Sequence, residues 1–394
     1  MNNILSIRTR KIEPSATVAL ADLTRELKSQ GCDVISLSSG EPDFDTPDPI
    51  KQSAIEAIQR GFTKYTNIEG IPALKMAISY KLRRDNQLDY ELNEIIVSNG
   101  AKQSIYNTIM AVLNAGDEVI IPAPYWVSYP PMVKIAEAVP VIIQTTLSKN
   151  FKITTQQLEE AITPKTRLLI LNSPNNPSGM AYSKSELEAL AEILLKYPNI
   201  LILSDDIYEY ILWGQDHFSN IMNACHKLRD RTIVINGASK AFAMTGWRIG
   251  YAAAPQAIIQ AMKKIQSQST SCPNSIAQVA ATTALGYNRS YFSYMYKTYK
   301  THHDLILKAL NQMKGAKCVP ADGTFYLFPD VTETVKRLKL RSDIELSTYL
   351  LNKTNVAVVP GSAFGLPGHI RLSCATSNEK LLKAIDRLST VLDQ

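Results

Sequence analysis

The feature that most constrains the fold is an alternation of short apolar runs with helical patterns through the middle of the 394-residue chain. The runs are continuously apolar, which is typical of strands that are covered on both faces. They occupy residues 94–97, 118–121, 167–172, 199–204, 232–236 and 249–254. Helical patterns occupy residues 102–113, 124–135, 183–196 and 255–268. In the third of these, Ser183 and Glu186 predict a capping box. This order predicts an α/β fold with a mostly parallel sheet between layers of helices.

The two ends of the chain have a different pattern. A long Tyr- and Lys-rich helical stretch at residues 290–313 leads to GTFYLFPDV, a helix, VAVVPG, HIRLSCA and a closing helix. Near the N-terminus, VISLSSGEPDF reads as a strand and a turn without a partner nearby in sequence. We therefore predict an N-terminal arm (1–15), a small α+β domain built from both ends (16–47 and 291–394) and a large domain (48–290).

Composition narrows the classes of function. Apolar residues make up 45% of the chain and charged residues 20%, the balance of a globular protein. The net charge of +6 comes from scattered basic residues without interleaved aromatics, so we expect no nucleic-acid partner. The five cysteines include no CxxC pair and the histidines no i, i+4 pair, so we expect no metal site and reduced, buried thiols. The N-terminal apolar stretch is too short for a secretory signal and no run predicts a membrane helix, so we expect a cytoplasmic protein.

Polar residues follow several of the predicted strands, and ligands of open α/β sheets bind at the carboxyl ends of strands. After EIIV, Gly100 precedes a helix whose first N–H groups can bind an anion. After RLLILN, two prolines flank Asn176, although an ordinary Asx-turn would also explain this loop. After NILILS come Asp205 and Asp206, whose side chains point to opposite faces of an extended chain, so at most one faces a site.

The loop after TIVIN carries Lys240 and, eight residues later, Arg248. A single lysine on a loop is usually only solvated. Together with the anion-binding helix start, the asparagine and a carboxylate three residues before a tyrosine, it fits pyridoxal phosphate. The phosphate of that cofactor needs N–H groups and an arginine, its ring nitrogen needs a carboxylate, and its aldehyde needs a lysine.

Seven motifs make the chain recognisable: SGEPDF, TKYTNIEGIP, PYWVSYP, NSPNNPSG, SDDIYE, SKAFAMTGWRIGY and HIRLSCA. In this order and spacing they resemble the fold-type-I aminotransferases of class I/II, most of all the bacterial aspartate aminotransferases that include aspartate/prephenate enzymes. The resemblance covers essentially the whole chain. It implies a large domain with a seven-stranded, mostly parallel sheet, a smaller α+β domain, and a homodimer with shared active sites.

The resemblance also implies roles for individual residues. Lys240 would form a Schiff base with the cofactor and later move a proton, which requires a lowered pKa. Asp205, rather than Asp206, would pair with the ring N–H, while Tyr208 and Asn176 would hydrogen-bond the ring oxygen. The remaining implied cofactor residues are Gly100, Ala101, Lys102, Ser239 and Arg248 around the phosphate, Trp126 on the ring face, and Tyr65 reaching the phosphate of the neighbouring subunit.

For the substrate, the resemblance implies that Arg371 grips the α-carboxylate with a bidentate fork. A surface ion pair is the alternative for Arg371, but the strand around it is otherwise apolar. Gly40, Trp126 and Asn176 would line the same subsite.

Two positions depart from the family pattern. Many relatives carry Ser or Thr where this chain has Gly237, so one phosphate hydrogen bond would be missing. Relatives that accept aspartate or prephenate often have a lysine where this chain has Glu13, and residues 103–114 supply no basic side chain. We therefore expect weaker discrimination between acidic and uncharged donors than a dedicated lysine would provide.

The implied reaction is a ping-pong transamination. An amino acid, with aspartate as the leading expectation, gives up its amino group, and a 2-oxo acid such as 2-oxoglutarate or oxaloacetate receives it. The alternatives are an aromatic, prephenate or alanine-type substrate, a pyridoxal-phosphate lyase on the same fold, and a non-catalytic regulator. Such regulators usually carry a fused DNA-binding domain, for which this chain has no room.

Overall fold

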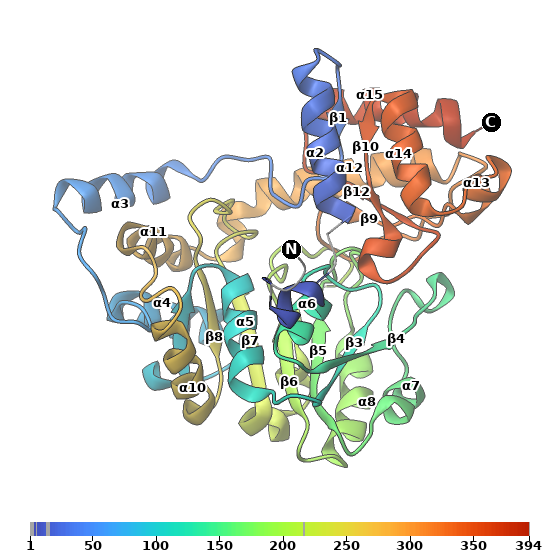
Figure 1. The fold of residues 1–394 in the computed structure, drawn as a ribbon. Helices are drawn as coiled ribbons and strands as arrows, with labels where there is room; N and C mark the ends of the chain where they lie inside the picture. Colours follow the sequence, from blue (N-terminus) through green and yellow to red (C-terminus); the bar gives the residue numbers. More distant parts are fainter. Residues whose placement is uncertain (1–3, 5, 13–15, 216, 394) are drawn as a thin grey trace.

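A seven-stranded sheet forms the centre of the structure, a computed structural model that describes residues 4, 6–12, 16–215 and 217–393 (Figure 1). Its strands are β2 (Ile95–Ser98), β3 (Glu118–Pro122), β4 (Val139–Ile143), β5 (Thr166–Asn172), β6 (Leu201–Asp205), β7 (Thr232–Gly237) and β8 (Gly250–Ala253). They lie in the order β2-β8-β7-β6-β5-β3-β4, and only β8 runs antiparallel to its neighbours. The prediction of a mostly parallel sheet is therefore confirmed.

Helices cover both faces of this sheet. One face packs against α5 (Ala101–Val112), α6 (Tyr129–Ile135) and α10 (Gln256–Ser267). The other packs against α4 (Pro72–Asn86), α8 (Lys184–Leu195) and α11 (Ser275–Gly286). Within β2, Ile95 and Val97 belong to one core and Ile96 to the other. This alternation explains why the strand is continuously apolar, since each side chain is buried whichever face it points to.

The remaining helices are α1 (Ile7–Arg10), α2 (Ala16–Ser29), α3 (Asp48–Gln59), α7 (Thr155–Ala161), α9 (Ile221–Ala224), α12 (Ser293–Leu310), α13 (Thr332–Arg337), α14 (Asp343–Thr354) and α15 (Asn378–Leu392). Among the helices of the described residues, none combines the length and apolarity needed to span a bilayer.

The segment from α2 onward meets the C-terminal part of the chain in a separate layer, whereas α1 lies beside α6 (Figure 1). Strand β1 (Ile35–Ser36) pairs in parallel with β10 (Val356–Ala357), and in Figure 1 α2 and β1 lie beside α14 and α15. Nearby, β9 (Tyr326–Leu327), β11 (Val359–Pro360) and β12 (Ile370–Ser373) form an antiparallel sheet in the order β11-β12-β9. The isolated strand near the N-terminus thus finds its partner more than 300 residues away, which supports the division into two domains that we propose.

Local sequence signals predicted some element boundaries and missed others. Ser183 caps α8 as expected, because its hydroxyl accepts the Glu186 N–H at 3.3 Å and the Glu186 carboxylate accepts the Ser183 N–H at 2.7 Å. The helix predicted from residue 124 begins only at Tyr129. The Tyr125 N–H instead donates to the Phe364 carbonyl at 3.0 Å, which holds this segment in a turn against the C-terminal part.

All five cysteines are free thiols, but the expectation that they are buried is wrong for three of them. Cys318 and Cys374 are buried, whereas Cys32, Cys225 and Cys272 are partly exposed.

Candidate active site

A cavity of about 650 Å³ opens at the carboxyl ends of β5 and β6. Segments far apart in sequence meet in its wall, including residues 38–41, the first turn of α5, and part of β12. The cavity brings together most of the residues selected from the sequence: Gly40, Ala101, Lys102, Trp126, Asn176, Asp205, Tyr208, Ser239, Lys240, Arg248 and Arg371. Gly100 is not part of the lining, but it lies against the Arg248 guanidinium. Tyr65 is also outside the lining and is 92% exposed.

A buried carboxylate lies at the inner end of the cavity. Asp205 is the last residue of β6; its Oδ2 accepts the Tyr129 hydroxyl at 2.5 Å and its Oδ1 accepts the Ile207 N–H at 3.3 Å. Burial raises the pKa of Asp205 to about 6, opposed by these hydrogen bonds and by the charge of Lys240. Asp206 lies outside the lining, where it accepts the Ser204 hydroxyl and an amide N–H of Asn220. Of these two aspartates, only Asp205 is therefore available to a ligand.

Lys240 lies in the loop after β7, with its ammonium donating to the carbonyl of Gly40 and 6.0 Å from the ring centroid of Tyr208. Burial, followed by the nearby charge of Arg371, lowers its pKa to about 8 from the usual 10.5. The amine is therefore neutral in about a tenth of the molecules at pH 7, far more than for a lysine of ordinary pKa. A neutral amine is what a nucleophile or a proton acceptor must offer.

Arg371 lies on β12 between two aromatic rings, 4.3 Å from the ring centroid of Tyr326 and 5.0 Å from that of Phe364. One Nη donates to Asn176 Oδ1 at 2.9 Å and the other to the Ser38 carbonyl at 2.8 Å. Its buried Nε has no hydrogen-bond partner among the described residues. A buried donor without a partner is costly, and an incoming carboxylate would satisfy it.

A second cationic site lies where β2 turns into α5. Arg248 donates to the Thr245 carbonyl at 3.0 Å and to the Asn99 carbonyl at 3.2 Å. A Cβ at Gly100, where φ is +86°, would lie 2.3 Å from Arg248 Nη2, so only glycine lets the guanidinium approach the turn. The free N–H groups at the start of α5 and the Ser239 side chain border the same region. These groups together form an anion-binding site.

The departure at Gly237 has a structural reason. A Cβ there would lie 2.8 Å from the Ile249 carbonyl oxygen and 2.9 Å from Gly250 Cα, because β7 and β8 approach closely at this point. Gly237 also lies outside the cavity lining. A serine or threonine would therefore require the strands to move before it could reach a ligand.

The Lys102 side chain is a further cation of the cavity. The resemblance implied a place for Lys102 around the phosphate, and the structure shows that its ammonium lies 4.9 Å from the ring centroid of Trp126 and lines the cavity. Burial, followed by the charge of Arg248, lowers its pKa. No ion pair joins Lys102 to a carboxylate within the described part of the chain. Glu13, which the sequence analysis discussed for the same task, lies outside the described residues.

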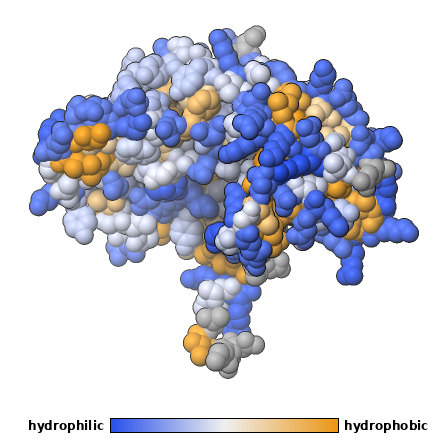
Figure 2. All heavy atoms as spheres, turned by 90° about the horizontal axis from the view of Figure 1, so that it is seen from above, coloured by the Kyte–Doolittle hydropathy of each residue, from blue (hydrophilic) through white to orange (hydrophobic). Residues whose placement is uncertain are grey.

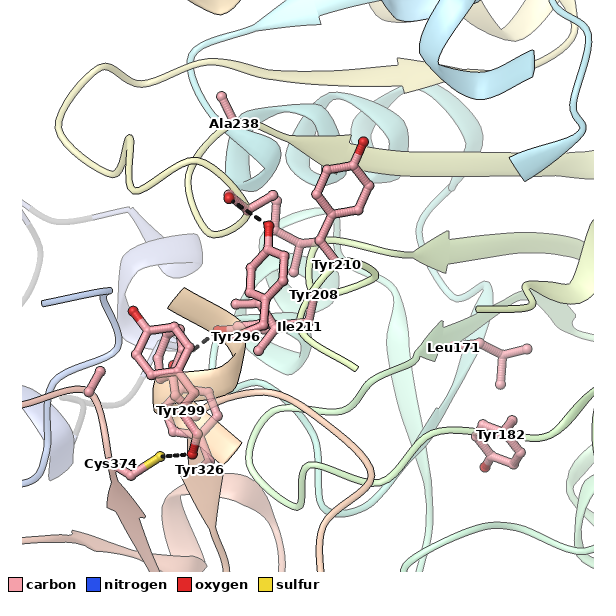
Figure 3. Packing of buried hydrophobic residues seen from close by; sticks show 14 of the residues in the cluster. Leu171, Tyr182, Tyr208, Tyr210, Ile211, Ala238, Tyr296, Tyr299, Tyr326 and Cys374 are labelled. Atoms are coloured by element: carbon pink, nitrogen blue, oxygen red, sulfur yellow. Dashed lines mark hydrogen bonds between the residues drawn. The ribbon is translucent and has the colours of Figure 1, made fainter. Parts of the chain in front are cut away.

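Three further residues support the site without having been selected. Tyr129 donates to Asp205, and Asn172 donates to the Asp205 carbonyl at 2.9 Å. The hydroxyls of Tyr326 and Tyr208 lie 3.0 Å apart. Figure 3 shows these last two side chains within the buried cluster. Asn172 could have been found from its place at the end of an apolar strand. Tyr129 belongs to the PYWVSYP motif, but no local signal predicted its bond to Asp205 or the bond of Tyr326 to Tyr208, because these partners are distant in sequence.

The cavity thus combines a buried carboxylate, a lysine with a lowered pKa and cationic groups at separate ends, which is the layout of an enzyme active site for anionic ligands. The chain belongs to the family described as aminotransferase class I and II, whose model matches residues 32–388. The protein is therefore a transaminase, and the family, fold and enzyme class predicted from the sequence are confirmed.

Individual relatives are similar over almost their full length. The aspartate/prephenate aminotransferase of Nitrosomonas europaea is 52% identical over 394 residues, which cover 98% of this chain and 99% of the relative. The aspartate aminotransferase of Rhizobium meliloti has a TM-score of 0.94 at 43% identity, covering 99% of this chain and 98% of its own. The aspartate aminotransferase of Thermus thermophilus with maleate has a TM-score of 0.92 at 42% identity, covering 98% and 99%.

Proposed function

We propose that this transaminase uses pyridoxal phosphate to transfer the amino group of aspartate to 2-oxoglutarate or oxaloacetate. One observation carries the proposal: a lysine with a lowered pKa and a buried carboxylate line the same cavity, which also has an anion-binding end. This donor set suits the aldehyde, the ring nitrogen and the phosphate of that cofactor.

The residues present fit the cofactor. Asp205 would face the ring nitrogen, and Tyr208 with Asn176 would face the ring oxygen. Trp126 would cover the ring, while the N–H groups of α5, Ser239 and Arg248 would hold the phosphate. The glycine at position 100, which makes room for the Arg248 guanidinium, supports this assignment. When bound, the cofactor supplies an electron sink for charge that develops at the substrate α-carbon.

The protein's own groups then have distinct tasks. Lys240 Nζ, whose neutral form is favoured because burial lowers its pKa, would carry the proton between the substrate α-carbon and the aldehyde carbon of the cofactor. The Asp205 carboxylate would hold a proton on the ring nitrogen, and the Tyr129 hydroxyl fixes the orientation of that carboxylate. Arg371 orients the substrate through its α-carboxylate, with Asn176 holding one arm of the guanidinium.

Lys102 supports aspartate as the donor. Its ammonium borders the cavity without a carboxylate partner in the described residues, so it can bind the distal carboxylate of a dicarboxylic substrate. The names of the relatives support the same choice, and maleate, a dicarboxylate, accompanies the Thermus thermophilus structure.

A panel of donors with 2-oxoglutarate as acceptor tests the donor assignment. Aspartate should have the highest kcat/KM, above phenylalanine and alanine. A higher value for an uncharged donor would overturn the assignment. Prephenate is a second candidate acceptor, favoured by the name of the Nitrosomonas europaea relative, and should be compared with 2-oxoglutarate using aspartate as donor. A lyase would instead release ammonia without any acceptor.

We also propose that the protein is a cytoplasmic homodimer with shared active sites. Hydrophobic side chains lie on the outer sides of α3 and α4, and Figure 2 shows apolar atoms at this end of the molecule. The exposed members are Ile55, Ile58, Phe62, Met76 and Tyr80, with Tyr65 between the two helices. An exposed apolar surface of this kind favours association with a second copy. Five cysteines without a disulfide agree with a reducing compartment.

Mixing two impaired variants tests whether the active sites are shared. A Lys240→Ala chain combined with a Tyr65→Phe chain should form hybrids in which one site carries both lesions and the other is intact. Activity above that of either parent supports sharing. Activity no higher than the parents, with subunit exchange verified by mass, would contradict it.

A further inference from the structure

The segment that links α3 to α4 carries Tyr65 and then lies against strand β2. The Val97 N–H donates to the Glu69 carbonyl at 3.0 Å. At Gly70, φ is +100° and a Cβ would lie 2.6 Å from Val97 Cγ2, so only glycine allows this close approach. Residues 66–71 are therefore held directly beside the strand that leads into the anion-binding turn at residues 99–100.

Two fully buried glutamines from neighbouring helices hold this segment. Gln278 on α11 accepts the Ile71 N–H at 2.7 Å and donates to Thr66 Oγ1 at 3.0 Å. Its second donor N–H goes to the Pro273 carbonyl at 2.9 Å. Gln278 thus binds the segment but contacts neither β2 nor α5 through hydrogen bonds.

Gln266 on α10 has a wider set of contacts. Its Nε2 donates to the carbonyls of Ile68 at 2.7 Å and Val97 at 2.8 Å. Its Oε1 accepts from Ser98 Oγ at 2.6 Å and from Asn107 Nδ2 at 2.9 Å. All four hydrogen-bonding positions of the amide are occupied, and the side chain is completely buried. One side chain therefore joins the segment 66–71, strand β2 and helix α5.

We propose that Gln266 is a positioning residue that serves two active sites of the dimer at once. Through Ser98 and Asn107 it holds both sides of the turn that binds phosphate in its own subunit. Through Ile68 it holds the segment that presents Tyr65 to the neighbouring subunit. Replacing a buried, fully bonded amide loosens every element that it joins. The inference rests on the proposed shared-site dimer.

Hydrogen exchange in the cofactor-free protein tests the connection without any enzymatic assay. Gln266→Met keeps the volume but removes the hydrogen bonds, and should raise amide exchange both at residues 66–71 and at residues 98–104. Gln278→Met is the matched control and should raise exchange at residues 66–71 only. Equal patterns in the two variants would overturn the proposal. If Gln266→Met does not fold, Asn107→Ala removes one of the four contacts and should give the Gln266 pattern at smaller amplitude.

Hybrid dimers with a single working site test the double role. On the Lys240→Ala chain, Gln266→Met and Gln278→Met should each lower kcat/KM of the intact site by about tenfold, the effect expected for one or two lost hydrogen bonds. On the chain that keeps Lys240, Gln266→Met should raise the Kd for pyridoxal phosphate by about the same factor. In that position Gln278→Met should leave this Kd unchanged. If Gln266→Met has an effect on only one of the two chains of the hybrid dimer, the double role is refuted.

Tyr65→Phe on the Lys240→Ala chain separates this inference from the proposed function. If it leaves the intact site unaffected, the proposal that the active sites are shared is wrong. The hydrogen-exchange experiment then still decides whether Gln266 connects the two segments. If Tyr65→Phe lowers activity while Gln266→Met on the same chain does not, the sites are shared but Gln266 does not position the segment.

Discussion

The inner end of the cavity and its outer side differ in how their charged groups are held. At the inner end, Asp205 is buried and both carboxylate oxygens have a donor, from Tyr129 and from the Ile207 N–H. On the outer side, the exposed Lys102 lies over the ring of Trp126 and has no carboxylate partner in the described residues. A group with fixed partners has one orientation before any ligand arrives, whereas an unpaired cation remains available to bind an anion.

This difference separates two properties of a transaminase. On the function that we propose, the chemical step is common to all substrates and depends on the fixed inner groups together with Lys240 and Arg371. On the same proposal, selection among substrates depends on the distal group, which would meet the outer side. Changes at the inner end should therefore affect all donors alike, and changes at Lys102 should affect them differently.

The largest effect is expected from Lys240→Ala. Loss of the amine removes the proton carrier, so kcat should fall by several orders of magnitude for every donor. Borohydride reduction of the holoenzyme followed by peptide mapping should recover the pyridoxyl group on Lys240. Recovery on another lysine would show that Lys240 is not the residue that forms the Schiff base.

The lowered pKa of Lys240 predicts a pH dependence for cofactor uptake. The neutral amine is the reactive form, and its fraction rises with pH through the pKa, so covalent uptake by the cofactor-free protein should rise with a midpoint near pH 8. At pH 7 uptake should be about two orders of magnitude faster than for a lysine of ordinary pKa. Because the charge of Arg371 contributes to the shift, Arg371→Met should move the midpoint to higher pH. A midpoint near 10.5 would show that the surroundings of Lys240 do not lower its pKa.

Arg371→Lys should reduce kcat/KM by about ten- to a hundredfold for acidic, aromatic and aliphatic donors alike. The lysine keeps the charge but loses the planar fork and the contact with two aromatic rings. Steady-state kinetics with three donors measure the effect. A loss confined to one donor would show that Arg371 selects among substrates and does not bind the α-carboxylate that they share.

The smallest expected effect comes from Lys102→Gln, and it should be selective. The ratio of kcat/KM for aspartate to that for alanine should fall by about tenfold, the effect of one charge-assisted contact. The Kd for pyridoxal phosphate should change little, because the backbone N–H at position 102 is retained. Lys134→Gln, on α6 outside the cavity lining, is the matched control. Equal losses for both donors would show that Lys102 does not read the distal carboxylate.

Sequence patterns predicted the central strands well because a strand that is buried on both faces must be apolar throughout. They missed β4, the edge strand, whose residues Val139 and Pro140 are exposed or partly exposed and do not form a buried run. They also extended the helix that contains Tyr129 by five residues at its start. The Tyr125 contact with Phe364 ends that helix earlier, and no local pattern encodes a contact across more than 200 residues.

The sequence by itself determined which residues stand at the carboxyl ends of neighbouring strands, and so it predicted Asn176, Asp205 and Lys240 in one place. The physical reason is that parallel strands end at the same edge of a sheet. Only the tertiary structure decided that the Lys102 side chain enters the cavity, and that Tyr129 binds Asp205 76 residues away. It also decided that Gln266 bonds to Ser98 168 residues away. These contacts depend on how helices pack across the sheet, where the partner of a polar side chain is set by the final fold and not by its neighbours in sequence.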